Sequence, residues 1–300
     1  MTGRRKLWFR RVVAWGLTLV VAWLASSLAV VAQLSSRMQR PFPEPPPAIG
    51  WGTVTPLRLQ SADGLGLGAW FVPGRPDRPT VLLLHGNGGC RGHLLGPAER
   101  VAADGCSVLM LTLRAHGDSD DETNDIGWSA RHDVAAAVAW LRDHHPGRPV
   151  VVWGQSLGSA AAVFAAPDLP AEVRGYILEC PYADLYTAVW NRLRLRMPLV
   201  PAVVAYAGMR AVAPVALPDA HRISPVEEAK RTPAGVRVLV LAGGEDGLAT
   251  PAEAEAIRDR LGDRAECVVF AGGGHLGLEV VDPERYWAAV RGLIDWCAFS

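Results

Sequence analysis

The chain has 300 residues, 50% hydrophobic and 20% charged, enough for one large α/β domain with a sizeable core or for two small domains. The formal net charge is zero, so the sequence lacks the excess of basic residues that is typical of nucleic-acid-binding domains. The five cysteines include no C-x-x-C pair, which argues against a zinc or redox motif. Their odd number argues against a full disulfide framework and leaves one bridge open.

Basic residues followed by an uncharged stretch open the chain. Five lysines and arginines fall within residues 1–11, and the apolar run of residues 12–34 is long enough to span a bilayer, which takes about 20 residues. We predict a basic cytoplasmic tail at 1–11 and a single transmembrane anchor at 12–34, with the rest of the chain outside the cytoplasm. A signal peptide cleaved near Ala32, giving a secreted protein, is the alternative; such peptides usually have a shorter apolar core, about 7–15 residues.

A proline-rich segment separates the anchor from the remaining sequence. Residues 40–50 read RPFPEPPPAIG, a composition that favours an extended, stiff chain over a packed core. We therefore predict a spacer at residues 35–52 and a single domain at residues 53–300.

Strand-like and helix-like stretches alternate in residues 53–300. Apolar runs predict strands at residues 53–60, 65–72, 80–84, 107–113, 150–153, 175–180, 236–243 and 265–270. Amphipathic or small-residue stretches predict helices at 133–145, 156–166, 251–261 and 283–296. This alternation predicts an α/β fold with a mostly parallel sheet covered on both faces, and with an antiparallel hairpin at its edge. Functional loops are then expected at the carboxyl ends of the strands.

Three loops that follow predicted strands carry a serine, an acid and a histidine. Gly154-Gln155-Ser156-Leu157-Gly158 lies between a strand and a small-residue helix, the setting in which a G-x-S-x-G motif forms a nucleophile elbow. Asp246 and His275 each follow a later strand, which gives the chain order Ser, Asp, His. Any one of these residues alone could be structural, and it is their joint order that predicts chemistry.

From about residue 53 onward the sequence resembles α/β-hydrolases of the monoacylglycerol-lipase-like and serine-aminopeptidase-like branch, including membrane-anchored α/β-hydrolase-domain proteins. The stretches that match are LLLHGNGG, LTLRAHGDSD, GWSARHDVAAAVAWL, VVWGQSLGSAAA, YILECPYADL, VLVLAGGEDGLATP and FAGGGH. The resemblance implies the α/β-hydrolase fold, with a small helical lid insertion at about residues 181–233. Two departures are modest: Ala130 stands where many relatives carry an acid, and the spacing from Asp246 to Pro251 differs.

The expected roles follow from the motif and the resemblance. Ser156 would be the nucleophile, His275 its general base and Asp246 the carboxylate that orients the histidine. The backbone N–H groups of Leu157 and, by the resemblance, Asn87 would form the oxyanion hole. The supporting loop residues are His85, Gly86, Gly154 and Gly158. No metal ligand cluster and no cofactor are expected.

Several other polar residues are assigned secondary roles. We expect His116 to serve the loop beside the site and Asp133 to anchor its helix. Glu179 and Asp184 are reserve candidates for the triad acid. Cys90 lies near the oxyanion loop, but as a nucleophile it would need a paired histidine of its own.

The sequence thus predicts a membrane-tethered serine hydrolase that cleaves carboxylic esters or thioesters of a small-molecule or lipid-like acyl substrate. Arg192, Arg194 and Arg196 could face anionic head groups or solvent. The membrane is the expected partner, through the N-terminal helix, with no nucleic acid and no obligatory protein partner. Two alternatives stay open: a peptidase of the serine-aminopeptidase type, and a catalytically inactive hydrolase fold used for binding.

Overall fold

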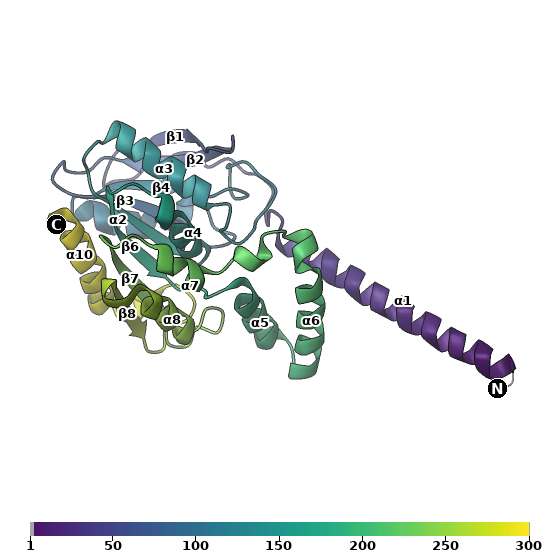
Figure 1. Cartoon of the computed structure of the whole chain (residues 1–300). Helices are drawn as coiled ribbons and strands as arrows, with labels where there is room; N and C mark the ends of the chain where they lie inside the picture. The colour runs from purple at the N-terminus through teal and green to yellow at the C-terminus, as the bar shows by residue number, and fades with distance from the viewer. Residues whose placement is uncertain (1–2, 300) are drawn as a thin grey trace.

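A long helix precedes the body of the molecule. The computed structural model describes residues 3–299; Met1 and Thr2 of the predicted basic tail, and Ser300, lie outside the described residues. Helix α1 runs from Gly3 to Leu34 and projects away from the rest of the chain (Figure 1). Large apolar side chains along its N-terminal two thirds are exposed. By length and composition, α1 is a candidate membrane-spanning helix.

The body is built on one eight-stranded sheet with the order β1-β2-β4-β3-β5-β6-β7-β8. The strands are β1 (Thr55–Gln60), β2 (Gly66–Val72), β3 (Thr80–Leu84), β4 (Ser107–Leu111), β5 (Val150–Gln155), β6 (Val173–Glu179), β7 (Arg237–Gly243) and β8 (Ala265–Phe270). β2 pairs antiparallel with β1 and with β4, and all other neighbours are parallel. The predicted mostly parallel sheet with an antiparallel hairpin at its edge is confirmed. The strand predicted at 107–113 ends at Leu111, because the next residues turn into the loop beside the site.

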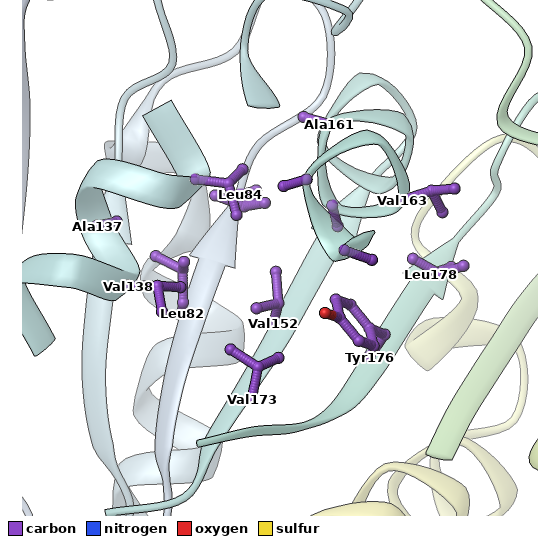
Figure 2. Packing of buried hydrophobic residues seen from close by; sticks show 14 of the residues in the cluster. Leu82, Leu84, Ala137, Val138, Val152, Ala161, Val163, Val173, Tyr176 and Leu178 are labelled. Carbon is purple, nitrogen blue, oxygen red and sulfur yellow. The ribbon is translucent and has the colours of Figure 1, made fainter. Parts of the chain in front are cut away.

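Helices cover both faces of the sheet. They are α2 (Leu95–Ala103), α3 (Arg131–His144), α4 (Leu157–Ala165), α7 (Pro225–Glu228), α8 (Pro251–Leu261), α9 (Leu278–Val281) and α10 (Pro283–Phe299). Apolar residues of α3, α4 and α8 pack on one face, and those of α2 and α10 pack on the other. Figure 2 shows the first of these layers, in which Val152, Tyr176 and Leu178 of the central strands lie beneath Ala161 and Val163 of α4. Helix α2 was not predicted from the sequence.

The segment between β6 and β7 forms a helical insertion that packs against α1. Helices α5 (Leu185–Arg196) and α6 (Leu199–Ala216) extend from the sheet-containing body, and α6 lies beside the C-terminal part of α1 (Figure 1). The two helices approach closely at Gly208, where a Cβ atom would collide with Ser27 Oγ and lie 2.9 Å from the Trp23 ring. Helix α6 is a second candidate membrane span by length and composition.

One end of the insertion is apolar and exposed. We call it the apolar tip; it comprises the exposed side chains of Leu195, Met197, Leu199, Val200, Val203 and Val204. Exposed apolar side chains grouped in this way are typical of contact with a membrane or a partner protein.

Candidate active site

Ser156 lies on a strained turn between β5 and α4. Its φ is 51° and its ψ is −107°, a conformation that costs a non-glycine residue roughly 1–3 kcal/mol. Glycines flank it because the turn is too tight for side chains. A Cβ on Gly158 would lie 2.6 Å from the carbonyl oxygen of Leu84, and one on Gly154 would overlap the backbone of Gly158. The G-x-S-x-G pattern therefore lets α4 start directly against the ends of β3 and β5.

The structure brings the three residues of the predicted triad together. His275 Nε2 is 2.9 Å from Ser156 Oγ, and His275 Nδ1 is 2.7 Å from Asp246 Oδ2. Ser156 and Asp246 are buried, with exposed fractions of 7% and 3%, while 18% of the His275 side chain is exposed. The three residues follow β5, β7 and β8, whose carboxyl ends meet at one edge of the sheet.

The carboxylate of Asp246 is held in place by its own loop. Its Oδ1 accepts hydrogen bonds from the backbone N–H groups of Leu248 (2.8 Å) and Ala249 (3.0 Å). Burial by itself would raise the pKa of Asp246, but the hydrogen bonds from His275 and from this backbone outweigh it and lower the pKa. Asp246 therefore stays ionised and can orient the imidazole of His275.

The predicted oxyanion loop follows β3 and faces Ser156. Within residues 3–299, the N–H groups of Asn87 and Leu157 have no internal acceptor, and both residues line the same pocket as Ser156. Two histidines hold the loop. His116 Nε2 accepts from the N–H of Gly88 (3.1 Å), and His85 Nε2 accepts from the N–H of Leu113 (3.0 Å). Burial, together with the neighbouring His116, lowers the pKa of His85 to about 3, so His85 is neutral and suited to this bracing role.

The reserve acids make no hydrogen bond to His275. Asp184 caps α5 by accepting from the N–H groups of Tyr186 and Thr187, and Glu179 is buried behind the elbow. Asp133 accepts from the backbone N–H (2.8 Å) and the Nε (2.9 Å) of Arg114 and so ties α3 to the loop beside the site.

The cysteines take no part in the hydrogen bonding of the triad side chains. All five are free within the described part of the chain. Burial raises the pKa of the Cys90 thiol, which keeps it in its weakly nucleophilic protonated form.

One group of side chains in residues 3–299 has the spacing of metal ligands. Ligand atoms of Cys180, Asp246 and His275 lie within 4.8 Å of one another. Burial raises the pKa of the Cys180 thiol well above its ordinary value, and a protonated thiol is a poor ligand. Asp246 and His275 already share a hydrogen bond, so the arrangement fits an acid–histidine pair better than a metal site.

An apolar pocket leads away from Ser156 between α5, α6 and the end of α1. The space between its walls has a volume of about 890 Å³, which includes open solvent at the mouth. Its walls include Val189 of α5, Met209 of α6, and Val31 and Leu34 of α1. The N-terminal helix is therefore part of the wall of the pocket that holds the candidate nucleophile.

Comparisons with known proteins agree with this geometry. A sequence model described as "alpha/beta hydrolase fold" matches residues 79–212. The esterase Pf2001 of Pyrococcus furiosus superposes with a TM-score of 0.66 at 19% identity, covering 84% of this chain and 98% of that one. The chain has the α/β-hydrolase fold, and these matches support its placement in the α/β-hydrolase superfamily.

Relatives of this α/β-hydrolase include proteins with and without a named activity. A protein of Mycobacterium tuberculosis, named as uncharacterized, is 27% identical over 281 residues, covering 91% of this chain and 92% of that protein. Lysophosphatidylserine lipase ABHD12 of Xenopus tropicalis is 28% identical over 151 residues, which cover 48% of this chain and only 38% of that lipase. A bacterial membrane phospholipase A has a similar structure, with a TM-score of 0.58 and 20% identity, and each chain is covered completely. The family and these relatives support hydrolase activity.

Sequence reasoning missed residues of this α/β-hydrolase that reach the site from the N-terminal helix and from the loop between β4 and α3. The end of α1 lines the pocket, and Asn124 donates through Nδ2 to Asn87 Oδ1 (2.7 Å) in the oxyanion loop. Neither contact has a local sequence signal, because the partners are far apart in the chain.

Glu179 gives this α/β-hydrolase a buried titrating group directly behind the elbow. Its Oε2 accepts from Gln155 Nε2 and Tyr286 Oη, each at 3.1 Å, while Oε1 has no partner within residues 3–299. Burial raises the pKa of Glu179 to about 7. The folded state therefore favours the neutral carboxyl of Glu179. The stabilisation of the fold that results is fully present below the unfolded-state pKa of about 4.5, and it is lost as the pH rises through the folded-state pKa of about 7.

We predict that Glu179→Gln, which cannot ionise, removes this pH dependence. Between pH 4.5 and 8 the wild type should lose about 3 kcal/mol of unfolding free energy relative to the variant. Thermal melts of both proteins across this range measure the difference, with exposed Glu255→Gln as the control. If wild type and Glu179→Gln differ in unfolding free energy by the same amount at pH 4.5 and at pH 8, the assignment to Glu179 is contradicted.

Proposed function

We propose that this chain is a membrane-anchored serine hydrolase that cleaves a carboxylic ester or thioester in a lipid-like acyl substrate. One observation carries the proposal: Ser156, which is hydrogen-bonded to His275 and through it to Asp246, lines an apolar pocket that the candidate membrane helix also lines.

The chemistry needs only water as the second reactant. Ser156 Oγ attacks the carbonyl carbon while His275 Nε2 takes the hydroxyl proton, and Asp246 stabilises the imidazolium that forms. The negative oxygen of the tetrahedral intermediate accepts from the N–H groups of Asn87 and Leu157. His275 then returns the proton to the leaving alcohol or thiol, which leaves an acyl group on Ser156. Water repeats these steps on the acyl-enzyme and releases the carboxylic acid.

The surroundings of the pocket support a lipid-like substrate. The pocket walls are mostly apolar, and α6, which forms one wall, begins at the apolar tip and runs beside α1 (Figure 1). A bilayer that accommodates α1 would lie close to this tip, so an acyl chain could reach the pocket without crossing water. Two proteins similar to this chain, a lysophosphatidylserine lipase and a membrane phospholipase A, agree with this substrate class.

The charges in the pocket favour an ester over a peptide amine. A peptidase that recognises a free amino terminus would place a carboxylate near the mouth of the pocket. The charged residues that line it within the described chain are Arg192 and Arg210. Arg192 Nη1 donates to the carbonyl oxygen of Ala188 (2.9 Å), and no acidic side chain in residues 3–299 pairs with this guanidinium within 4.0 Å. An inactive binding protein, for its part, would have no need of a complete triad.

We predict that a fluorophosphonate probe labels the wild type and that Ser156→Ala abolishes the labelling. The probe reacts only with a serine that a neighbouring base activates. Ser129→Ala is the control, because the Ser129 hydroxyl makes no hydrogen bond within the described chain. Equal labelling of folded wild type and Ser156→Ala, or no labelling of either, would refute the serine mechanism.

We predict that esters with long acyl chains are better substrates than acetyl esters, and that Arg192 favours those with an anionic alcohol group. Arg192→Met should raise the KM for an anionic ester by about tenfold, because the substrate loses one charge-assisted hydrogen bond. The KM for a neutral ester of the same acyl length should change little. Steady-state kinetics with matched esters measures both effects, with exposed Arg196→Met as the control.

A preference for the shortest acyl group would contradict the acyl pocket. Equal changes in KM for the neutral and the anionic ester would contradict the role of Arg192.

We also propose that the N-terminus lies in the cytoplasm and the catalytic domain outside it. Five basic residues precede the apolar run, whereas only Arg37 and Arg40 follow it closely. A phosphatase reporter fused after Ser300, which folds only outside the cytoplasm, is predicted to be active. An inactive phosphatase together with an active cytoplasmic reporter at the same position would reverse the assignment.

A further inference from the structure

The segment that follows the anchor helix lies against the catalytic domain instead of standing free as a spacer. We call residues 35–44 the juxtamembrane clamp. Arg37 fastens it: Nε donates to the carbonyl oxygen of Asp121 (3.0 Å), Nη1 to that of Gly117 (3.2 Å), and Nη2 to that of Ser119. The backbone N–H of Arg37 donates to the carbonyl oxygen of Glu122 (2.7 Å). The side chain is only 4% exposed, so its donors are committed to a single loop.

Glu44 holds the other end of the clamp in the domain. Its side chain is 4% exposed, and Oε1 accepts from Arg91 Nη1 (3.0 Å) and Thr112 Oγ1 (2.8 Å). Arg91 also pairs through both terminal nitrogens with Asp118, at 2.6 and 2.7 Å. A buried and hydrogen-bonded charge cluster of this kind fixes geometry strongly, because removing one partner leaves another charge unpaired. The clamp and the loop of residues 112–124 are therefore held as one unit.

This loop holds the oxyanion loop in turn. The backbone N–H of Asn124 donates to the carbonyl oxygen of Ser35 (2.8 Å), and its Nδ2 donates to Asn87 Oδ1 (2.7 Å). Asn124 thus contacts the clamp with one group and the oxyanion loop with another. His116, from the same loop, accepts from the N–H of Gly88. The clamp also reaches Gly88 directly, since Gln39 Nε2 is 3.4 Å from its carbonyl oxygen.

We propose that the juxtamembrane clamp is a positioning element of the catalytic centre, with Arg37 and Asn124 as the positioning residues that set the N–H of Asn87 for the oxyanion. This inference rests on the proposed serine hydrolase function. Oxyanion donors act only when they are held close to the position of the developing charge, and a misplacement of about 1 Å can cost roughly a hundredfold in rate. The anchor therefore shapes the site as well as tethering it. Cleavage near Ala32 would remove Val31 from the pocket wall and free the clamp at one end.

The test measures turnover per active site in the full-length chain in detergent. Arg37→Met and Asn124→Ala are compared with the wild type on a neutral ester, and the active sites are counted by fluorophosphonate titration. We expect kcat per titrated site to fall about tenfold or more, with KM within about twofold, because oxyanion donors act on the transition state more than on substrate binding. Arg37→Lys, which keeps the charge but loses the fork of donors, should recover part of the loss.

Arg40→Met is the matched control, since Arg40 is exposed and makes no hydrogen bond or ion pair within residues 3–299. A fall in thermal stability with unchanged kcat per titrated site in both variants would mean a structural role alone and would overturn the proposal. If Arg37→Met does not fold, Asn124→Ala decides, since it removes one amide group and leaves the clamp's charges in place. A wild type that takes no probe would instead refute the serine hydrolase function.

Discussion

The close packing of helix α4 against the ends of β3 and β5 is the constraint on which the site depends. All nine residues of α4 are buried, and the helix can reach this position only because Gly154 and Gly158 carry no side chain. The turn between strand and helix then forces Ser156 to a φ of 51°, and burial of the helix offsets the strain. The hydroxyl is thereby directed away from the sheet, toward the histidine that follows β8. Parallel strands complete the arrangement by ending at a single edge, so residues 119 positions apart meet at hydrogen-bond distance.

The N-terminal helix and the helical insertion form a second unit on top of this edge. Val31 of α1 shares an apolar cluster with Met209 and Val212 of α6, and the pocket above Ser156 lies between them. A pocket built in this way depends on α1 for part of its wall. Helix α1 continues into a segment that contacts the oxyanion loop, so a single stretch of chain reaches both the pocket wall and that loop. This arrangement explains why a polar, proline-rich segment has two buried charged side chains, Arg37 and Glu44.

Local patterns predicted most of the fold and the position of the candidate triad. The alternation of apolar strands and amphipathic helices predicted the mostly parallel sheet. The elbow around Ser156 has a strand-turn-helix signature within about ten residues. Helix α2 was not predicted, because it has only nine residues, carries Gly96 and Pro97 in its first turn and begins without a capping side chain. The contacts of Arg37 and Glu44 could not be predicted, since their partners lie about 50 to 80 residues away and charge pairs carry no periodic signal. The spacer was expected to be extended, and its docking on the domain follows from tertiary structure alone.

The most direct test is the structure of the full-length chain after reaction with a long-chain alkyl phosphonate. The account predicts phosphorus bonded to Ser156 Oγ and the phosphonyl oxygen within hydrogen-bond distance of the N–H groups of Asn87 and Leu157. It also predicts that the alkyl chain runs between α5 and α6 and contacts Val31 or Leu34 of α1. A phosphonate on another residue, or an alkyl chain that leaves the pocket without touching α1, would contradict the account.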